Sequence, residues 1–198
     1  MSVKLRPATP EDIPVLQHWD AQPHVIAATG SDAPPDWIED IGLTSPAFQT
    51  LIGEQGGRPV GVVQIIDPAG EPTRYWGDCE RNLRAIDIWI GEPDCLGQGL
   101  GTQMMTQAIE RCFAAPEVTA ILIDPLETNT DAQRFYRRLG FEEVGPRRFG
   151  DDDCTVMRLT RAGWEGRALP GQRPGSVAVG VADRSISKRA SLPVWVCS

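Results

Sequence analysis

Glycines alternate with other residues near the middle of this chain, in the run Cys95-Leu96-Gly97-Gln98-Gly99-Leu100-Gly101-Thr102. The run follows a strand-like segment and precedes one with helical periodicity. Glycines let the backbone approach an anion, and the first N–H groups of a helix point at it. The pattern therefore predicts a phosphate-binding turn, with a plain tight turn as its alternative. The predicted binding residues are Gly97 and the five residues after it, with the backbone N–H groups of Gln98, Gly99, Leu100, Gly101 and Thr102 as donors.

Acidic residues lie close to this turn along the sequence. Three isoleucines share one face of the predicted strand Arg84–Gly91, so Asp87 and Trp89 share the other. Asp124 ends a second, apolar strand, where capping a turn together with Pro125 is its alternative role. A carboxylate in such a position can hold a cation or accept a proton, whereas a solvated or ion-paired acid would have neither role.

The elements that would position these residues alternate between strands and helices. A helix is expected from Pro10 to Asp20, a loop from Ala21 to Pro35, and a short helix near residues 36–41. Further helices are expected from the glycine-rich turn to Phe113 and from Asn129 to Leu139, which Gly140 ends. The predicted strands are Val3–Arg6, Phe48–Gly53, Pro59–Asp67, Arg84–Gly91, Val118–Asp124, Phe141–Val144 and Thr155–Leu159.

The bulk composition fits one soluble domain followed by a tail. With 198 residues and 41% hydrophobic content, the chain can build one sizeable core. We expect a domain at residues 1–162 and a loosely docked or disordered tail rich in proline and glycine at residues 163–198. A net charge of -8 argues against a nucleic-acid partner and mildly favours a cationic substrate.

The five cysteines are spread along the chain without a metal-ligand spacing, so neither a metal site nor a disulfide framework is expected. The first residues lack the apolar segment of a signal peptide, and no run approaches the roughly 20 apolar residues of a membrane helix. These observations predict a cytoplasmic protein with reduced thiols and no membrane partner.

The segment from Leu96 to Gly101 resembles the Q/R-x-x-G-x-G/A turn of the GNAT acetyltransferase superfamily, which grips the pyrophosphate of acetyl-CoA with its backbone. Leu96 stands where the family has Gln or Arg. The likeness extends from Val3 to Leu159 in the order of elements. It implies the GNAT fold, an α/β (α+β) arrangement with a central mixed, mostly antiparallel sheet of about six to seven strands flanked by about four helices.

Three segments are similar to the aminoglycoside 6′-N-acetyltransferases: Ala85–Asp94, Ile123–Pro125 with Asn129, and Arg134–Phe141. The resemblance implies acetyl-CoA as acyl donor and no metal. It implies that Asp87 holds the acceptor ammonium and takes its proton, and that Asp124 binds the substrate. Glu71 and Asp78 lie in the loop Pro68–Leu83 before the Asp87 strand, and we expect them to complete an acidic pocket.

On the donor side, the resemblance implies that Tyr136 gives its proton to the coenzyme A thiolate, with a tyrosine that only packs in the core as the alternative. Asn129 would bond the pantetheine arm, unless it only caps its helix. The N–H groups of Trp89 and Ile90 would meet the thioester carbonyl, provided that their strand splays away from its neighbour.

The predicted reaction is transfer of an acetyl group from acetyl-CoA to a small, cationic, aminoglycoside-like acceptor. A primary amine of the acceptor attacks the thioester directly. An acyltransferase acting on a siderophore precursor or a protein N-terminus is an alternative. A non-catalytic acyl-CoA-binding module is another, although such a module needs neither Asp87 nor Tyr136. Association into a homodimer, through the tail or an edge strand, is left open.

Overall fold

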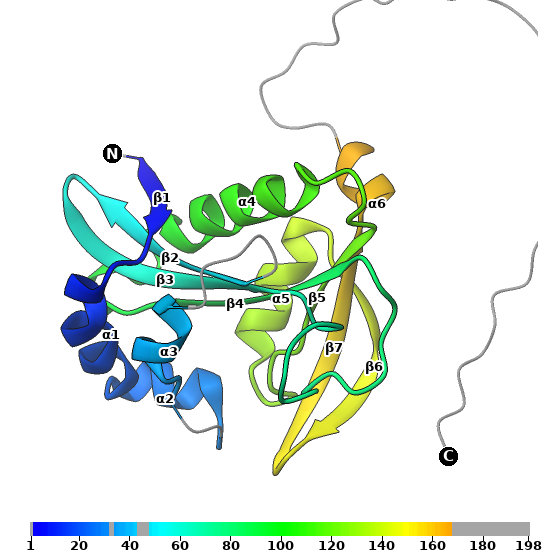
Figure 1. Ribbon diagram of the computed structural model, residues 1–198, viewed down its shortest axis with the longest axis horizontal. Coiled ribbons are helices and arrows are strands. Elements are labelled where there is room, and N and C mark those ends of the chain that lie inside the picture. The colour runs from blue at the N-terminus through cyan, green and yellow to red at the C-terminus, as the bar shows by residue number, and fades with distance from the viewer. Residues whose placement is uncertain (1, 32–33, 43–47, 168–198) are drawn as a thin grey trace, which may run out of the picture. The chain divides into compact units, whose positions relative to one another are not determined.

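The computed structural model describes residues 2–31, 34–42 and 48–167. Its centre is a seven-stranded sheet with the strand order β1-β2-β3-β4-β5-β7-β6 (Figure 1). Neighbouring strands run antiparallel except β4 and β5, which are parallel, so the predicted mixed, mostly antiparallel sheet is confirmed. The strands are β1 (Val3–Pro7), β2 (Phe48–Gln55), β3 (Arg58–Ile66), β4 (Leu83–Ile90), β5 (Ala120–Ile123), β6 (Glu142–Phe149) and β7 (Asp152–Thr160).

Helices cover both faces of this sheet. Figure 1 shows α4 on one side of the strands and α1 to α3 on the other. The α-helices of the described residues are α1 (Ile13–Asp20), α2 (Pro23–Thr29), α3 (Trp37–Gly42), α4 (Leu100–Phe113), α5 (Thr130–Leu139) and α6 (Arg161–Glu165). Short 3₁₀ turns, η1 (Pro10–Asp12) and η2 (Pro93–Cys95), precede α1 and the glycine-rich turn.

Two of these helices correct the prediction. Helix α2 lies where a loop is expected: Pro23 occupies its first position, Val25 is buried, and the Gln22 carbonyl accepts the N–H groups of Val25 and Ile26. Helix α6 crosses the expected domain boundary, because the Thr160 side chain accepts the Gly163 N–H and continues the ordered chain. The tail prediction for residues 168–198 lies outside the described residues.

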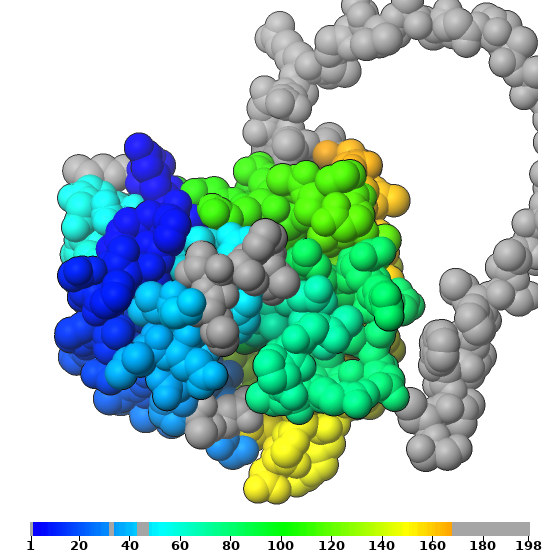
Figure 2. Space-filling view, viewed as in Figure 1, coloured from blue at the N-terminus to red at the C-terminus, as the bar shows by residue number. Residues whose placement is uncertain are grey.

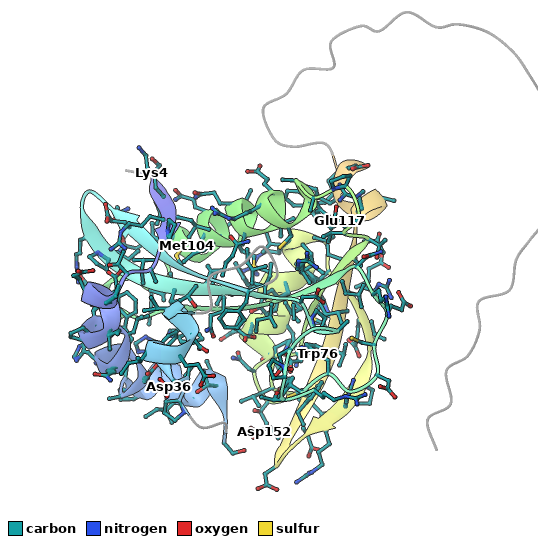
Figure 3. The ribbon with its side chains drawn as sticks, in the orientation of Figure 1. Lys4, Asp36, Trp76, Met104, Glu117 and Asp152 are labelled. Atoms are coloured by element: carbon teal, nitrogen blue, oxygen red, sulfur yellow. The ribbon has the colours of Figure 1, made fainter. Side chains whose placement is uncertain are left out.

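The predicted amphipathic helix after the glycine-rich turn is confirmed as α4. Its buried stripe includes Met104, Met105 and Ile109, and Figure 3 shows Met104 between the helix and the sheet. Each such side chain contributes roughly 1.5–3 kcal/mol on burial. This stripe packs on the face of β4 that carries Ile86 and Ile88, while Trp89 on the opposite face packs with the cluster under α1 and α3. The predicted alternation along β4 is therefore confirmed.

Strands β4 and β5 separate soon after they meet. Their parallel pairing joins Leu83–Ala85 to Ala120–Leu122, after which β5 ends at Ile123 while β4 continues to Ile90. Beyond Ala85, β4 is paired with β3 alone. The result is a gap in the middle of the sheet that side chains from both faces can reach. No helix in the described part of the chain is long and apolar enough to cross a bilayer.

Candidate active site

A cleft of about 640 Å³ opens beside the gap between β4 and β5. Its walls come from α1 to α3, the loop 67–82 that follows β3, the ends of β4 and β5, and β7. Figure 2 shows the N-terminal helices on one side and this loop on the other, with the tip of the β6–β7 hairpin below. Among the described lining residues there is no Lys or Arg, but there are six carboxylates: Asp20, Asp40, Glu71, Asp87, Asp124 and Asp152.

Asp87 and Tyr136 reach this cleft from opposite faces of the sheet. Asp87 lies on the Trp89 face of β4, whereas Tyr136 projects from α5 and packs in the core on the other face. Burial raises the pKa of the Tyr136 hydroxyl above its ordinary value, and the nearby Asp87 and Asp124 carboxylates raise it further. The phenol therefore keeps its proton at neutral pH and can act as a proton donor.

The Asp124 carboxylate is held by a residue to which sequence reasoning assigned no role. The Tyr75 hydroxyl donates a hydrogen bond of 2.7 Å to Oδ2 of Asp124. The ring of Tyr75 stacks on Phe149, with 4.5 Å between the ring centroids. The only sequence signal was an aromatic pair, Tyr75-Trp76, in an otherwise polar loop. Figure 3 shows Trp76 in this loop.

The structure places the two acidic residues predicted from that loop differently, one in the cleft and the other in solvent. Glu71 lines the cleft, and its carboxylate accepts the backbone N–H groups of Thr73 at 2.8 Å and Tyr75 at 2.9 Å. Asp78 is not part of the cleft: it is almost fully exposed and pairs with Arg74. Arg74 and Gly77 both adopt positive φ values, which turn the chain so that Asp78 points into solvent. The prediction that Asp78 completes the acidic pocket is therefore wrong.

Three cleft carboxylates were missed by sequence reasoning. Asp20 accepts the indole N–H of Trp37 at 2.6 Å, and Asp40 accepts the side-chain amide of Gln64 at 2.9 Å. Burial raises the pKa of both carboxyls, since each has lost water and gained only a neutral donor.

The third missed carboxylate, Asp152, lies at the tip of the β6–β7 hairpin, beside the end of α2 (Figure 3). It accepts the backbone N–H and the hydroxyl of Ser31, both at 2.8 Å. Sequence reasoning placed this residue in a charged turn. Asp152 is far along the chain from the other cleft carboxylates, so no sequence pattern connects it with them. Only the folded chain brings these carboxylates together.

The glycine-rich turn lies outside this cleft, at the beginning of α4. Gly97 and Gly99 have φ values of 72° and 76°, a left-handed conformation that favours glycine. An added Cβ at either residue would meet nothing within 4 Å, so the turn is open on that side. The N–H groups of Leu100, Gly101 and Thr102 belong to the first turn of α4, where no intrahelical carbonyl is in reach. Open backbone with free donors fits a diphosphate without a basic side chain at Leu96.

The connection from β4 to this turn is held rigidly. The Trp19 indole donates a hydrogen bond of 2.8 Å to Glu92, and this bond is the main cause that lowers the pKa of Glu92. Arg58 pairs with both Glu92 and Asp94. Gly91 lies directly on the Trp19 ring, where a Cβ would approach a ring carbon to 2.0 Å. Close packing thus determines the path of the backbone into the turn.

The strand register corrects one of the two predicted backbone donors. The Gly91 N–H bonds the Val60 carbonyl at 3.0 Å, and Trp89 pairs with Val62 in the same register. Because successive residues alternate in direction, the Trp89 N–H faces β3 and those of Ile88 and Ile90 face the gap. Trp89 is therefore unsuited as a donor to a group in the gap, and Ile88 takes its place beside Ile90.

Asn129 caps helix α5, as its alternative role predicts. Its Oδ1 accepts the Ala132 N–H at 3.0 Å. A further bond to the pantetheine arm of the donor stays a prediction.

Comparison with known proteins agrees with this geometry. The family described as "Acetyltransferase (GNAT) domain" matches residues 8–149. Aminoglycoside N(6′)-acetyltransferase type 1 of Klebsiella pneumoniae is 29% identical over 172 residues, which cover 83% of this chain and 86% of that protein. The kanamycin resistance protein of Rhizobium radiobacter is 35% identical over 96 residues, covering 48% of this chain and 89% of that protein.

Solved structures show the same relationship. AAC(6′)-Ib in complex with coenzyme A and kanamycin superimposes with a TM-score of 0.73 and 30% identity, over 83% of this chain and 98% of that one. A complex of AAC(6′)-Ib with acetyl-CoA gives a TM-score of 0.75 and 29% identity, over 86% of this chain and 100% of that one. The predicted fold is confirmed, and the chain belongs to the GNAT acetyltransferase family.

Proposed function

We propose that this chain transfers the acetyl group of acetyl-CoA to the 6′-amine of an aminoglycoside. It is an acetyl-CoA-dependent N-acetyltransferase by family, and its relatives are named for aminoglycosides and bound to coenzyme A and kanamycin. The observation that carries the choice of acceptor is the cleft, where six carboxylates and no Lys or Arg occupy the described lining. Such a surface complements a small molecule with several ammonium groups.

At the donor end, acetyl-CoA supplies an activated thioester. The N–H groups of the glycine-rich turn would bind its diphosphate. The Ile88 and Ile90 N–H groups, which face the gap, would donate to the thioester carbonyl and stabilise the negative charge that grows on its oxygen. Both sets of donors are backbone N–H groups, so the strength of their hydrogen bonds to the bound donor depends on the positions of β4 and α4.

At the acceptor end, an ammonium must lose a proton before its nitrogen can attack. Asp87 would hold the ammonium and take that proton, directly or through water. Asp124, oriented by Tyr75, would hold a second cationic group of the same molecule. The buried Tyr136 hydroxyl would give its proton to the departing sulfur, and its raised pKa keeps that proton available.

The test is turnover, followed by release of the coenzyme A thiol, with kanamycin and with a congener that carries a hydroxyl in place of the 6′-amine. We expect acetylation of kanamycin alone and an acetyl group on the 6′-nitrogen by NMR. Asp87→Asn should lower kcat/KM for kanamycin by roughly a hundredfold or more, the range for loss of a positioned base. Turnover of siderophore precursors or peptide N-termini without turnover of any aminoglycoside would replace this proposal by its alternatives.

A further inference from the structure

His24 makes one contact that ties the acceptor wall to the donor strand. It is the second residue of α2, a helix whose Val25, Ile26, Ala28 and Thr29 line the cleft. Its Nε2 lies 2.8 Å from the carbonyl oxygen of Ile90, the last residue of β4. A carbonyl oxygen can only accept, so Nε2 carries the proton in this bond.

The Ile90 carbonyl needs such a donor because it lies at the open edge of β4. The register that turns the Ile90 N–H toward the gap turns its carbonyl the same way. Strand β5 has already ended at Ile123 and offers no N–H there. His24 therefore supplies, from a helix remote in sequence, the hydrogen bond that a neighbouring strand would supply in a continuous sheet.

The bond also determines the orientation of the residue that presents a donor to the thioester. Rotation of the Ile90 backbone would move its N–H away from the gap, and it would also disturb Gly91, which lies against Trp19 and leads into the glycine-rich turn. The His24 ring resists that rotation from the gap side, as the Gly91–Val60 bond does from the β3 side.

We propose that His24 is a positioning residue that holds the Ile90 backbone so that its N–H meets the thioester carbonyl of the bound donor. The inference rests on the proposed acetyl transfer but not on the identity of the acceptor. It concerns hydrogen bonding through Nε2–H, which both the neutral ring and the imidazolium retain. In this role His24 donates a hydrogen bond and takes no proton from the substrate, which separates it from a general base.

Variants of His24 can separate these roles. Gln carries an amide N–H at the same reach as Nε2, Asn carries one that falls short by a carbon, and Ala carries none. We expect His24→Ala and His24→Asn to weaken the binding of acetyl-CoA roughly tenfold, as measured by calorimetry. The binding of coenzyme A should weaken less, since coenzyme A lacks the thioester carbonyl that the Ile90 N–H would meet. His24→Gln should restore most of the affinity and should leave the pH profile of kcat unchanged.

His18→Ala is the matched control, because His18 lies exposed on α1 and contacts Gln22 outside the cleft. Its donor binding should equal that of the unmodified chain. Thermal unfolding would identify any variant that fails to fold, and the comparison of Gln with Asn then decides the question. The inference is overturned if folded His24→Gln and His24→Asn bind acetyl-CoA alike, or if His24→Gln loses the acid limb of the rate profile, as replacement of a general base would. Because calorimetry needs no acceptor, failure to acetylate aminoglycosides would overturn the proposed function and leave this inference standing.

Discussion

Two side chains that line the cleft beside the gap in the sheet, Asp87 and Tyr136, have opposite requirements for charge. The Asp87 carboxylate must be ionised to hold an ammonium, whereas the Tyr136 hydroxyl must be neutral to release a proton. Burial of Tyr136 and the nearby carboxylates both disfavour its ionised form. The same acids that attract the acceptor therefore keep the proton donor in its protonated state.

Replacement of Tyr136 by Phe tests this role at the residue scale. The variant keeps the ring in the core and removes the hydroxyl, so kcat should fall by roughly 10²-fold while acetyl-CoA affinity stays nearly the same. Because the pKa of Tyr136 is raised, its ionisation should not reduce kcat of the unmodified chain below about pH 10, the ordinary tyrosine value. Steady-state rates from pH 6 to 9.5 with calorimetry of the donor measure both effects. An unchanged kcat would remove Tyr136 from the mechanism.

At the scale of elements, the start of the first helix is tied to the first strand by a buried carboxylate. Asp12 accepts two hydrogen bonds from the Arg6 guanidinium, at 2.7 and 2.8 Å, and a third from the Thr9 N–H at 2.8 Å. The bonds from Arg6 are the main cause that lowers the pKa of Asp12. Since α1 carries Asp20 to the cleft and Trp19 to Gly91 and Glu92, this tie positions one wall of the site and the connection to the glycine-rich turn.

Asp12→Asn should lower the free energy of unfolding by about 1–3 kcal/mol at pH 7, because hydrogen bonds to a charged group are lost. A carboxyl with a lowered pKa in the folded state stabilises the fold above its unfolded value, near pH 4, and loses this effect as the pH falls through the folded value. The difference in the free energy of unfolding between the unmodified chain and Asp12→Asn, measured with urea, should therefore shrink from pH 7 toward pH 3. A difference that is constant with pH would contradict the ion pair.

The glycine-rich turn allows a matched test of backbone function. Gly99 and Gly57 both have positive φ, 76° and 85°, and an added Cβ would meet nothing within 4 Å at either. Gly57 lies in the turn between β2 and β3 and not in the glycine-rich turn. Alanine at either position should cost about 1–2 kcal/mol of stability through the left-handed conformation. Gly99→Ala alone should weaken coenzyme A binding, measured by calorimetry, and equal binding by both variants would place the diphosphate elsewhere.

At the scale of the whole molecule, charge is distributed unevenly. Many acidic side chains outside the cleft pair with an arginine, as Asp12 does with Arg6, Glu92 with Arg58 and Glu143 with Arg137. Within the cleft, Asp20 and Asp40 are instead held by the neutral side chains of Trp37 and Gln64. The net charge of -8 thus has a concentrated negative component where the acceptor would bind.

Salt should therefore weaken acceptor binding in proportion to the number of cations on the acceptor. The screening length falls from about 10 Å at 0.1 M salt to about 3 Å at 1 M. We expect the KM for kanamycin, with its several ammonium groups, to rise more steeply with salt than the KM for a monoamine acceptor. Measuring both at saturating acetyl-CoA removes the effect of salt on the donor. Equal salt dependence would show that the carboxylates do not act together on the acceptor.

The sequence by itself determined the elements whose formation is local. A two-residue period identifies β4 and separates Asp87 from the isoleucines, and glycines before an amphipathic stripe identify the turn and α4. Neighbouring residues along a strand or a helix have fixed relative directions, so these features follow from spacing alone. The same reasoning identified Asn129 and Gly140 at the two ends of α5.

Tertiary structure decided what depends on contacts between distant segments. Helix α2 is short, and it is held by the burial of Val25 and by the bond from His24 to Ile90, which no local pattern reveals. The backbone conformation of a loop leaves Asp78 outside the cleft, and the packing of separate elements places Asp20, Asp40 and Asp152 in its lining. Side-chain directions in loops and the meeting of distant carboxylates are products of the assembled fold, because the energy that determines them is gained only when those segments pack together.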